Sequence, residues 1–260
     1  MLKTTANDGV KLAYRKTGSA GTAVMLIHGW MVSGAVYNDL MEPLGSEGLR
    51  ILTPDLRGSG ESDRPASGYT IERYARDVLA VADAEKVEKF VAVGHSMGGQ
   101  IAQWLAAHHP DRVAGMVLLC TVPASGMQLP PEAVELFSNS GGRPDLQRTI
   151  LTMATKQLSS DSMERLLGDA ASIPAGCIRE GFDNWRQAAF ADKLGAVRAR
   201  TLVVATDDPF LPPDFLQAQV VSKIARARLA VLPGPGHYVQ VERPRETAAL
   251  LNSFFAAMGD

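Results

Sequence analysis

The chain has 260 residues, of which 46% are hydrophobic and 21% charged, so it is long enough to bury a large core. Its formal net charge is −2 and it contains no long run of Lys or Arg, which argues against a nucleic-acid partner. The two cysteines, Cys120 and Cys177, lie far apart without metal-binding spacing, so we expect neither a disulfide framework nor a zinc site, and no cofactor.

The first residues, Met1 to Asp8, lack the charged, then apolar, then small-residue order of a secretory signal. No segment approaches the roughly 18 consecutive apolar residues that a membrane helix needs. We therefore expect a cytoplasmic protein with no membrane partner.

Apolar runs and amphipathic patterns alternate through the first half of the chain. Buried strands are predicted at 24–27, 50–53, 90–93 and 113–120, and helices at 70–84 and 96–108. In the first of these helices, Ile71, Tyr74 and Val78 recur at spacings of three and four, which is one apolar face. Such alternation predicts an α/β fold with a mostly parallel, doubly wound sheet.

This alternation stops between residues 122 and 191, where Pro, Gly and Ser separate short helical patterns at 145–158 and 161–167. It resumes with a strand at 201–205, a helix at 214–224, a strand at 229–232 and a helix at 244–258. We therefore expect one core domain, residues 1–121 and 192–260, with an inserted helical cap at 122–191.

A serine stands in a glycine-rich turn directly after the strand at 90–93. The segment Gly94-His95-Ser96-Met97-Gly98-Gly99 joins this strand to a helix, which is the context that a nucleophile elbow requires. A strained turn at Ser96 crowds the positions two before and two after it, so both need a residue without a β-carbon. The pattern alone also fits a simple tight turn, but its flanking elements favour a catalytic nucleophile at Ser96.

Several spaced motifs in one order make the chain resemble an α/β-hydrolase over essentially its full length. These motifs are His28-Gly29-Trp30, Asp55-Leu56-Arg57-Gly58-Ser59-Gly60-Glu61-Ser62, the turn around Ser96, and Gly236-His237. The resemblance implies a serine hydrolase with a catalytic triad and an oxyanion hole. It also implies that Asp55 and Arg57 shape a loop, although Arg57 meeting an anionic substrate is an alternative.

A serine hydroxyl needs an imidazole to remove its proton, and the chain offers five histidines. His95 is adjacent to Ser96 and is expected to pack beside the turn. His28 is expected to make structural hydrogen bonds, and His108 and His109 end a helix. His237, in the loop before the last helix, matches the position of the family's base.

The resemblance also indicates which acid orients this base. Asp207 and Asp208 both follow the strand at 201–205, and the family pattern of an acid before proline selects Asp208. Asp207 is the alternative, with a solvated loop charge as its other interpretation. Backbone N–H groups of Trp30 and Met97 are the oxyanion donors that the family's geometry implies.

Apolar side chains are available for a substrate pocket beneath the cap. The expected lining residues are Trp30, Phe182, Trp185, Phe210 and Tyr238. Several cap residues, Phe182 and Trp185 among them, fit equally well in the core of the cap itself, and the Trp30 ring fits as a partly buried aromatic without substrate contact.

The sequence thus predicts hydrolysis of a moderately hydrophobic carboxylic ester, a small-molecule substrate, through an acyl-enzyme. The segment from Gly236 to Glu242 also resembles meta-cleavage-product hydrolases, so cleavage of a carbon–carbon bond or an enol-lactone is an alternative. Perhydrolase or cofactor-free haloperoxidase activity, with the same triad, is another. A ligand receptor on the same fold is the non-enzymatic alternative, whereas haloalkane dehalogenation is disfavoured because it needs an aspartate at position 96.

Overall fold

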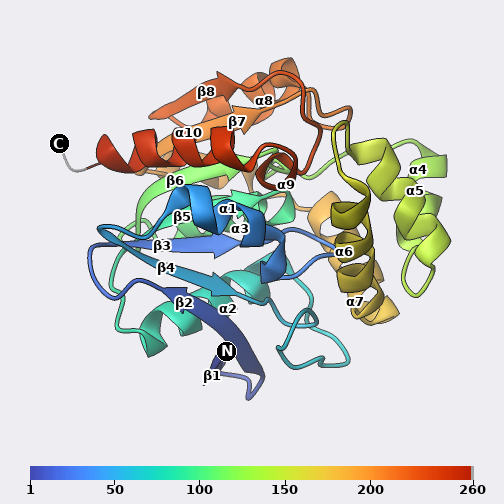
Figure 1. The fold of residues 1–260 in the computed structure, drawn as a ribbon, viewed down its shortest axis with the longest axis horizontal. Coiled ribbons are helices and arrows are strands. Elements are labelled where there is room, and N and C mark those ends of the chain that lie inside the picture. Colours follow the sequence, from blue (N-terminus) through green and yellow to red (C-terminus); the bar gives the residue numbers. More distant parts are fainter. Residues whose placement is uncertain (259–260) are drawn as a thin grey trace.

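A computed structural model describes residues 1–258 and shows one eight-stranded sheet in the order β1-β2-β4-β3-β5-β6-β7-β8 (Figure 1). The strands are β1 (Leu2–Thr5), β2 (Lys11–Thr17), β3 (Thr22–Ile27), β4 (Leu49–Pro54), β5 (Phe90–His95), β6 (Val113–Leu119), β7 (Arg200–Ala205) and β8 (Ala227–Val231). The strands β4, β3, β5, β6, β7 and β8 pair in parallel, each with the next in this order. Toward the β1 edge of the sheet, β2 pairs antiparallel with both β4 and β1. The predicted fold class is confirmed.

Helices cover both faces of this sheet. The helices of the core are α1 (Asn38–Leu44), α2 (Ile71–Ala84), α3 (Met97–His108), α8 (Pro213–Gln219), α9 (Val239–Glu242) and α10 (Pro244–Ala256), with short 3-10 helices η1 (Gly34–Tyr37), η2 (Ala191–Ala196) and η3 (Val221–Lys223). Helices α1 and α10 pack on one another at one face, and α2 and α3 pack together at the other (Figure 1). Parallel strands that are buried on both faces need apolar residues throughout, which explains the unbroken apolar runs of β3, β5 and β6.

Between β6 and β7, a stretch that the structure describes throughout, lie four α-helices and then η2, and no strand. They are α4 (Pro131–Ser138), α5 (Pro144–Ala154), α6 (Ser160–Ala171) and α7 (Ala175–Arg186). In Figure 1 they lie together at the end of the sheet toward which the arrows of the parallel strands point. Ligands bind at the carboxyl ends of the strands in open α/β sheets, so this inserted segment lies over the expected binding region.

Side-chain oxygens that accept backbone N–H groups attach the inserted segment to the core. Asp169 accepts from Ser33 N at 2.6 Å, and Glu180 accepts from Gly68 N and Tyr69 N at 3.0 and 2.9 Å. Asn184 accepts from Ile71 N at 2.8 Å. Within residues 1–258, no helix is long and apolar enough to cross a membrane.

Several predicted helices differ in extent from those observed. The pattern at 145–158 predicts a helix that ends four residues beyond the end of α5, which is at Ala154. The pattern at 214–224 divides into α8 and η3, because the backbone turns at Val220 (φ −124°, ψ −60°). By contrast, α2 begins where the sequence indicates, because the Thr70 side chain accepts the N–H of Arg73 as an N-cap.

Candidate active site

Ser96 lies at the sharp turn between β5 and α3. Its backbone has φ 56° and ψ −120°, a conformation that costs a non-glycine residue about 1–3 kcal/mol. Neighbouring backbone holds the turn in place: Ser96 N donates to Leu119 O, and the N–H groups of Val122 and Gly99 donate to Ser96 O. The serine side chain is thereby presented at the carboxyl edge of the sheet, next to the N-terminus of α3.

The glycines around Ser96 are required by close backbone approach. A β-carbon at Gly94 would collide with the carbonyl oxygen of Gly98, and one at Gly98 would collide with the carbonyl oxygen of Ile27. Gly29 brings the loop after β3 against the elbow, since a β-carbon there would lie 3.0 Å from Cβ of Ser96. The turn and the loop that carries Trp30 therefore pack as one unit.

His237 and Asp208 form a close pair beside this turn. Nδ1 of His237 lies 2.6 Å from Oδ2 of Asp208, whose carboxylate is fully buried, while the imidazole is 13% exposed. The second oxygen, Oδ1, accepts the N–H of Phe210 at 2.8 Å. A carboxylate only accepts hydrogen bonds, so the neutral imidazole carries its proton on Nδ1 and has a free lone pair on Nε2.

The neighbouring carboxylate has a different partner. Asp207 is exposed, and its Oδ2 accepts the N–H of Gly234 at 2.9 Å. Asp207 N in turn donates to Pro235 O at 3.1 Å. Of the two candidate acids, Asp208 therefore contacts the His237 ring, whereas Asp207 binds the backbone of the loop before His237.

Two other histidines lie buried near the turn. Nδ1 of His28 donates to Gly29 O, and its Nε2 accepts the N–H of Leu56, so this side chain links two loops. Nε2 of His95 lies 2.9 Å from the carbonyl oxygen of His237. Burial lowers the pKa of both rings, for His95 with the neighbouring His237 adding to the effect, and both are therefore neutral.

The loop after β3 and the start of α3 carry the two expected oxyanion donors. Trp30 and Met97 both border a small void between these segments. Within residues 1–258, neither backbone N–H donates to another protein group, so both remain available to a ligand. Met97 directly follows Ser96 in the chain, and Trp30 lines a cavity together with Ser96, so both N–H groups belong to residues beside the turn.

The Trp30 ring joins the core to the inserted segment. Its Nε1 donates to Ile178 O at 2.8 Å, and the ring stacks on Phe137 with 5.6 Å between centroids. Phe182 and Trp185 pack beside it, at 5.8 and 6.3 Å. Phe182 is fully buried within this aromatic cluster and does not line the cavity described next, so it belongs to the core of the inserted segment.

A small cavity of about 50 Å³ opens between the turn and the inserted segment. Ser96 and His237 both line it, together with Trp30, Met31, Val122, Met127, Leu129, Phe137, Ile150, Ala154, Trp185, Phe210, Leu211 and Tyr238. Four of the five expected pocket residues are among these side chains. Met31, Val122, Ile150 and Leu211 were not predicted, because single apolar residues in loops and helices carry no local sign of facing a cavity.

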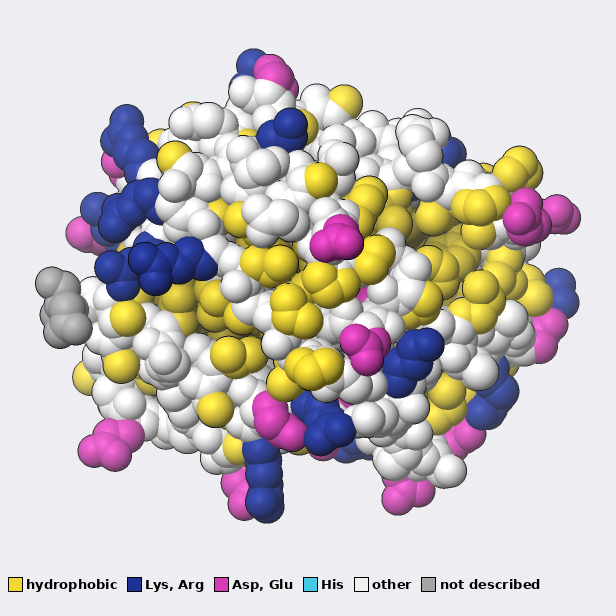
Figure 2. Space-filling view, turned by 90° about the horizontal axis from the view of Figure 1, so that it is seen from above, with side chains coloured by type: hydrophobic (Ala, Val, Ile, Leu, Met, Phe, Trp, Pro, Cys, Tyr) yellow, Lys and Arg dark blue, Asp and Glu magenta, His cyan; other side chains and the backbone are white. Residues whose placement is uncertain are grey.

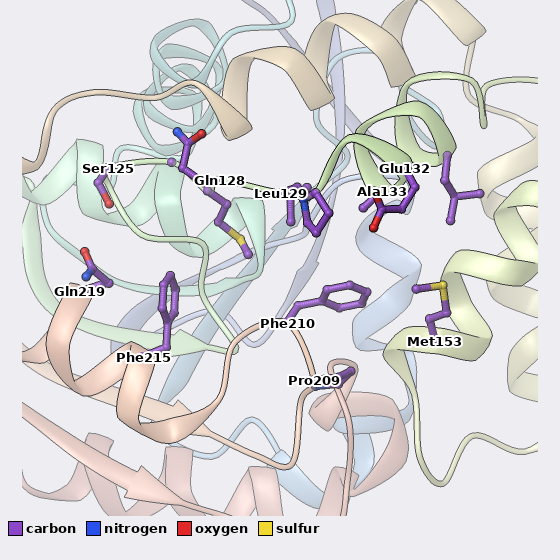
Figure 3. A pocket seen from close by; sticks show the side chains of 14 residues that line it. Ser125, Gln128, Leu129, Glu132, Ala133, Met153, Pro209, Phe210, Phe215 and Gln219 are labelled. Carbon is purple, nitrogen blue, oxygen red and sulfur yellow. The ribbon is translucent and has the colours of Figure 1, made fainter.

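A larger groove of about 830 Å³ adjoins this cavity and shares Met127, Leu129 and Phe210 with it. Figure 3 shows Leu129 and Phe210 in the middle of the groove, with Phe215 on one side and Met153 on the other. In Figure 2 hydrophobic side chains line a hollow on the side of the molecule that carries the inserted segment. The two spaces together offer an apolar site of the size that small-molecule ligands occupy.

Arg57 lies outside both spaces. Its guanidinium pairs with the buried Asp77 through Nε at 2.6 Å and Nη2 at 2.7 Å, and with Asp8 at 3.0 Å. Asp55 is likewise internal and accepts the N–H groups of Gly34 and Glu61. These contacts are structural, in agreement with the expectation for both residues.

Known proteins resemble the chain over nearly its whole length. A family model for the alpha/beta hydrolase fold matches residues 22–244. A non-heme haloperoxidase from Rhodococcus erythropolis is 30% identical, over 90% of this chain and 91% of its own. A 2-hydroxymuconate semialdehyde hydrolase from Pseudomonas sp. (strain CF600) is 29% identical, over 95% and 91%.

One similar solved structure is described as Est816, an N-acyl homoserine lactone degrading enzyme. It superposes on this chain with a TM-score of 0.83 and is 31% identical, and the match covers 96% of this chain and 99% of that one. The sheet, the sharp turn at Ser96 and the residues matched by the family model lead to one conclusion: the chain belongs to the α/β-hydrolase fold family.

Proposed function

We propose that this protein is a serine hydrolase that cleaves a moderately hydrophobic carboxylic ester through an acyl-enzyme. One observation carries the proposal: Ser96 lines a single apolar cavity with His237, whose far nitrogen is held by the buried carboxylate of Asp208. This is the constellation that nucleophilic catalysis by a serine needs. Trp30 and Met97 serve as the backbone oxyanion donors.

In the acylation step, Ser96 Oγ attacks the ester carbonyl carbon and passes its proton to Nε2 of His237. The negative charge that develops on the carbonyl oxygen is received by the backbone N–H groups of Trp30 and Met97. The carbon–oxygen bond to the alcohol then breaks, and the alcohol leaves with the proton held by His237. Asp208 stabilises the imidazolium throughout and keeps its tautomer.

Deacylation repeats these roles with water as the nucleophile. His237 takes a proton from water as it attacks the acyl carbon, and then returns a proton to Ser96 Oγ as the acid is released. The apolar walls of the cavity limit the water that reaches the acyl-enzyme. The products are one carboxylic acid and one alcohol, so atoms balance without any cofactor.

The two connected spaces suggest the shape of the substrate. The inner cavity, of about 50 Å³, holds only the reacting ester group and a few further atoms, since a single water needs about 10–15 Å³ of such space. A longer chain must pass Met127, Leu129 and Phe210 into the outer groove, where Leu136, Met153 and Phe215 offer apolar contact. An ester with one extended aliphatic chain fits this arrangement.

A lactone is the second candidate substrate, because one structural relative with 31% identity degrades an N-acyl homoserine lactone. Ring opening of a lactone uses the same acyl transfer and leaves acid and alcohol in one product. Carbon–carbon cleavage and cofactor-free perhydrolysis remain alternatives, since a semialdehyde hydrolase and a haloperoxidase are similarly related.

The test follows release of p-nitrophenol from acetate, butyrate and octanoate esters by the native chain, Ser96→Ala and His237→Ala. We expect multiple turnover that both substitutions abolish. Phe215→Ala alters the outer groove and not the inner cavity. We expect it to lower kcat/KM for octanoate about ten-fold while leaving acetate unchanged, because the longer chain loses an aromatic contact.

The absence of turnover on every ester would overturn the esterase proposal. Lactones, vinylogous diketones and peroxide-dependent halogenation would then distinguish the alternatives. A single slow acylation of Ser96, without turnover, would instead favour a ligand receptor.

A further inference from the structure

Glu242 is a buried carboxylate to which the sequence assigned no role. It ends α9, is 9% exposed, and accepts four backbone N–H groups. Its Oε2 accepts from Gly236, Lys156 and Gln157 at 2.9, 2.9 and 2.8 Å, and its Oε1 accepts from Tyr238 at 3.2 Å. Multiple N–H bonds to an ionised acceptor are strong and directional, so this carboxylate strongly constrains the segments that it joins.

These four donors come from two places in the fold. Gly236 and Tyr238 are the immediate neighbours of His237, whereas Lys156 and Gln157 follow α5 in the inserted segment. One side chain therefore holds both flanks of the base and ties them to the segment that covers the cavity. The helix predicted at 145–158 ends early, at Ala154, where the chain turns toward this carboxylate.

The backbone of His237 itself is held on both sides. Its N–H donates to Ala154 O at 2.8 Å, again in the inserted segment. Its carbonyl oxygen accepts from Nε2 of His95, the residue before Ser96, at 2.9 Å. Gly236 allows this close approach, because a β-carbon there would collide with Ala154 O and lie 2.8 Å from Cα of Thr155.

We propose that Glu242 is a positioning residue for His237, and that it makes the placement of the base depend on docking of the inserted segment. This inference rests on the proposed function, in which His237 removes the proton of Ser96. Without the carboxylate, four N–H groups lose their acceptor. The backbone of His237 then keeps only its bonds to Ala154 and His95, and its ring keeps its bond to Asp208. The imidazole then samples positions that are out of line with Ser96, and small misplacements cost about 100-fold in rate.

The test uses the complete chain and diethyl p-nitrophenyl phosphate, which reports on Ser96 whatever the natural substrate is. Ser96 Oγ forms a bond to phosphorus, the bond from phosphorus to p-nitrophenolate breaks, and the serine proton passes to His237. One equivalent of p-nitrophenol is released, and the rate measures how well the base is placed. Ser96→Ala gives the background.

Glu242→Gln is nearly isosteric but presents one N–H₂ group where a carboxylate oxygen accepted. We expect its phosphorylation rate and its kcat on butyrate ester to fall about 10- to 100-fold, with KM within about two-fold of the native value. Glu242→Asp keeps the charge on a shorter side chain, and we expect a rate between the native one and that of Glu242→Gln. It supplies the comparison if Glu242→Gln does not fold.

Glu180→Gln is the matched control, because Glu180 also ties the inserted segment to the core by accepting two backbone N–H groups, but far along the chain from His237. We expect it to lower the unfolding temperature without changing the phosphorylation rate. If Glu242→Gln and the native chain had equal phosphorylation rates, the inference about Glu242 would be overturned and the proposed function would stand. The same would follow if Glu242→Gln and Glu180→Gln lost equal fractions of this rate. A native chain that releases no p-nitrophenol would overturn the assignment of Ser96 and the inference with it.

Discussion

Asp208 and His237 are 29 residues apart in the chain, yet Oδ2 of the acid lies 2.6 Å from Nδ1 of the imidazole. They come from the loops that follow β7 and β8, two strands that pair in parallel. The other oxygen of Asp208 binds the N–H of Phe210, which lines both the cavity and the groove. Asp208 therefore holds the His237 ring and one wall of the cavity together.

The substitution Asp208→Asn tests whether His237 needs the carboxylate of Asp208 or only a side chain of the same size beside it. The amide can donate to Nδ1, which favours the tautomer with a proton on Nε2, so we expect kcat to fall about 10³- to 10⁴-fold. Asp207→Asn is the control: its amide oxygen still accepts the exposed N–H of Gly234, and we expect less than a two-fold change. Steady-state kinetics on butyrate ester compares them, and equal losses would contradict the assignment of Asp208.

Gly98→Ala tests the crowding at the nucleophile turn. The new β-carbon would meet Ile27 O and lie 2.5 Å from His28 O, so we expect about 3 kcal/mol less stability and a displaced Trp30 loop. Gly168→Ala in α6 meets nothing within 4 Å and should raise stability by about 0.5–1 kcal/mol. Urea unfolding measures the stability of both variants. If Gly98→Ala were as stable as the native chain, the loop that carries Trp30 would be able to move away from the new β-carbon at little cost.

Asp77→Asn tests the buried ion pair beneath the site. It leaves the Arg57 guanidinium buried without its main partner, so we expect about 3 kcal/mol of destabilisation. Asp83→Asn, on the same helix α2, breaks the solvent-exposed pair with Arg112 and should cost less than about 1 kcal/mol. Urea unfolding compares the two. A small effect at Asp77 would mean that Asp8 alone compensates Arg57.

The two buried neutral histidines predict how stability depends on pH. Burial lowers the pKa of His28 and His95 in the folded state below the unfolded value of about 6.5. The unfolded chain therefore binds more protons in acid, so this contribution to stability is complete above pH 6.5 and is lost below it, by at most about 1.4 kcal/mol per pH unit for each histidine.

Urea unfolding at pH 7.5 and 5.0 should show a lower free energy of unfolding at pH 5.0, with a loss of at most about 4 kcal/mol from these two groups. His108→Gln removes an exposed histidine and should leave the difference unchanged. A native chain that is equally stable at both pH values would show that these rings are accommodated in their charged form.

Local sequence was sufficient to predict the order of most strands and helices and the sharp turn at Ser96. The reason is physical: apolar periodicity and the glycines around Ser96 act over a few residues, and their consequences are the same in any well-packed context. The antiparallel strands β1 and β2 carried weaker patterns, because β1 lies at the edge of the sheet and three of its four residues are exposed.

Tertiary structure decided which residues meet. Glu242 accepts the N–H of Gln157 across 85 positions, and Trp30 donates to Ile178 across 148, and neither pairing leaves a local pattern. Phe182 and Trp185 lie on the same helix at helical spacing, yet only Trp185 reaches the cavity. Residue type and spacing determined the chemistry available to the chain. Packing of the inserted segment on the sheet determined how His237 is held and which side chains line the cavity, because those contacts form only between surfaces distant in sequence.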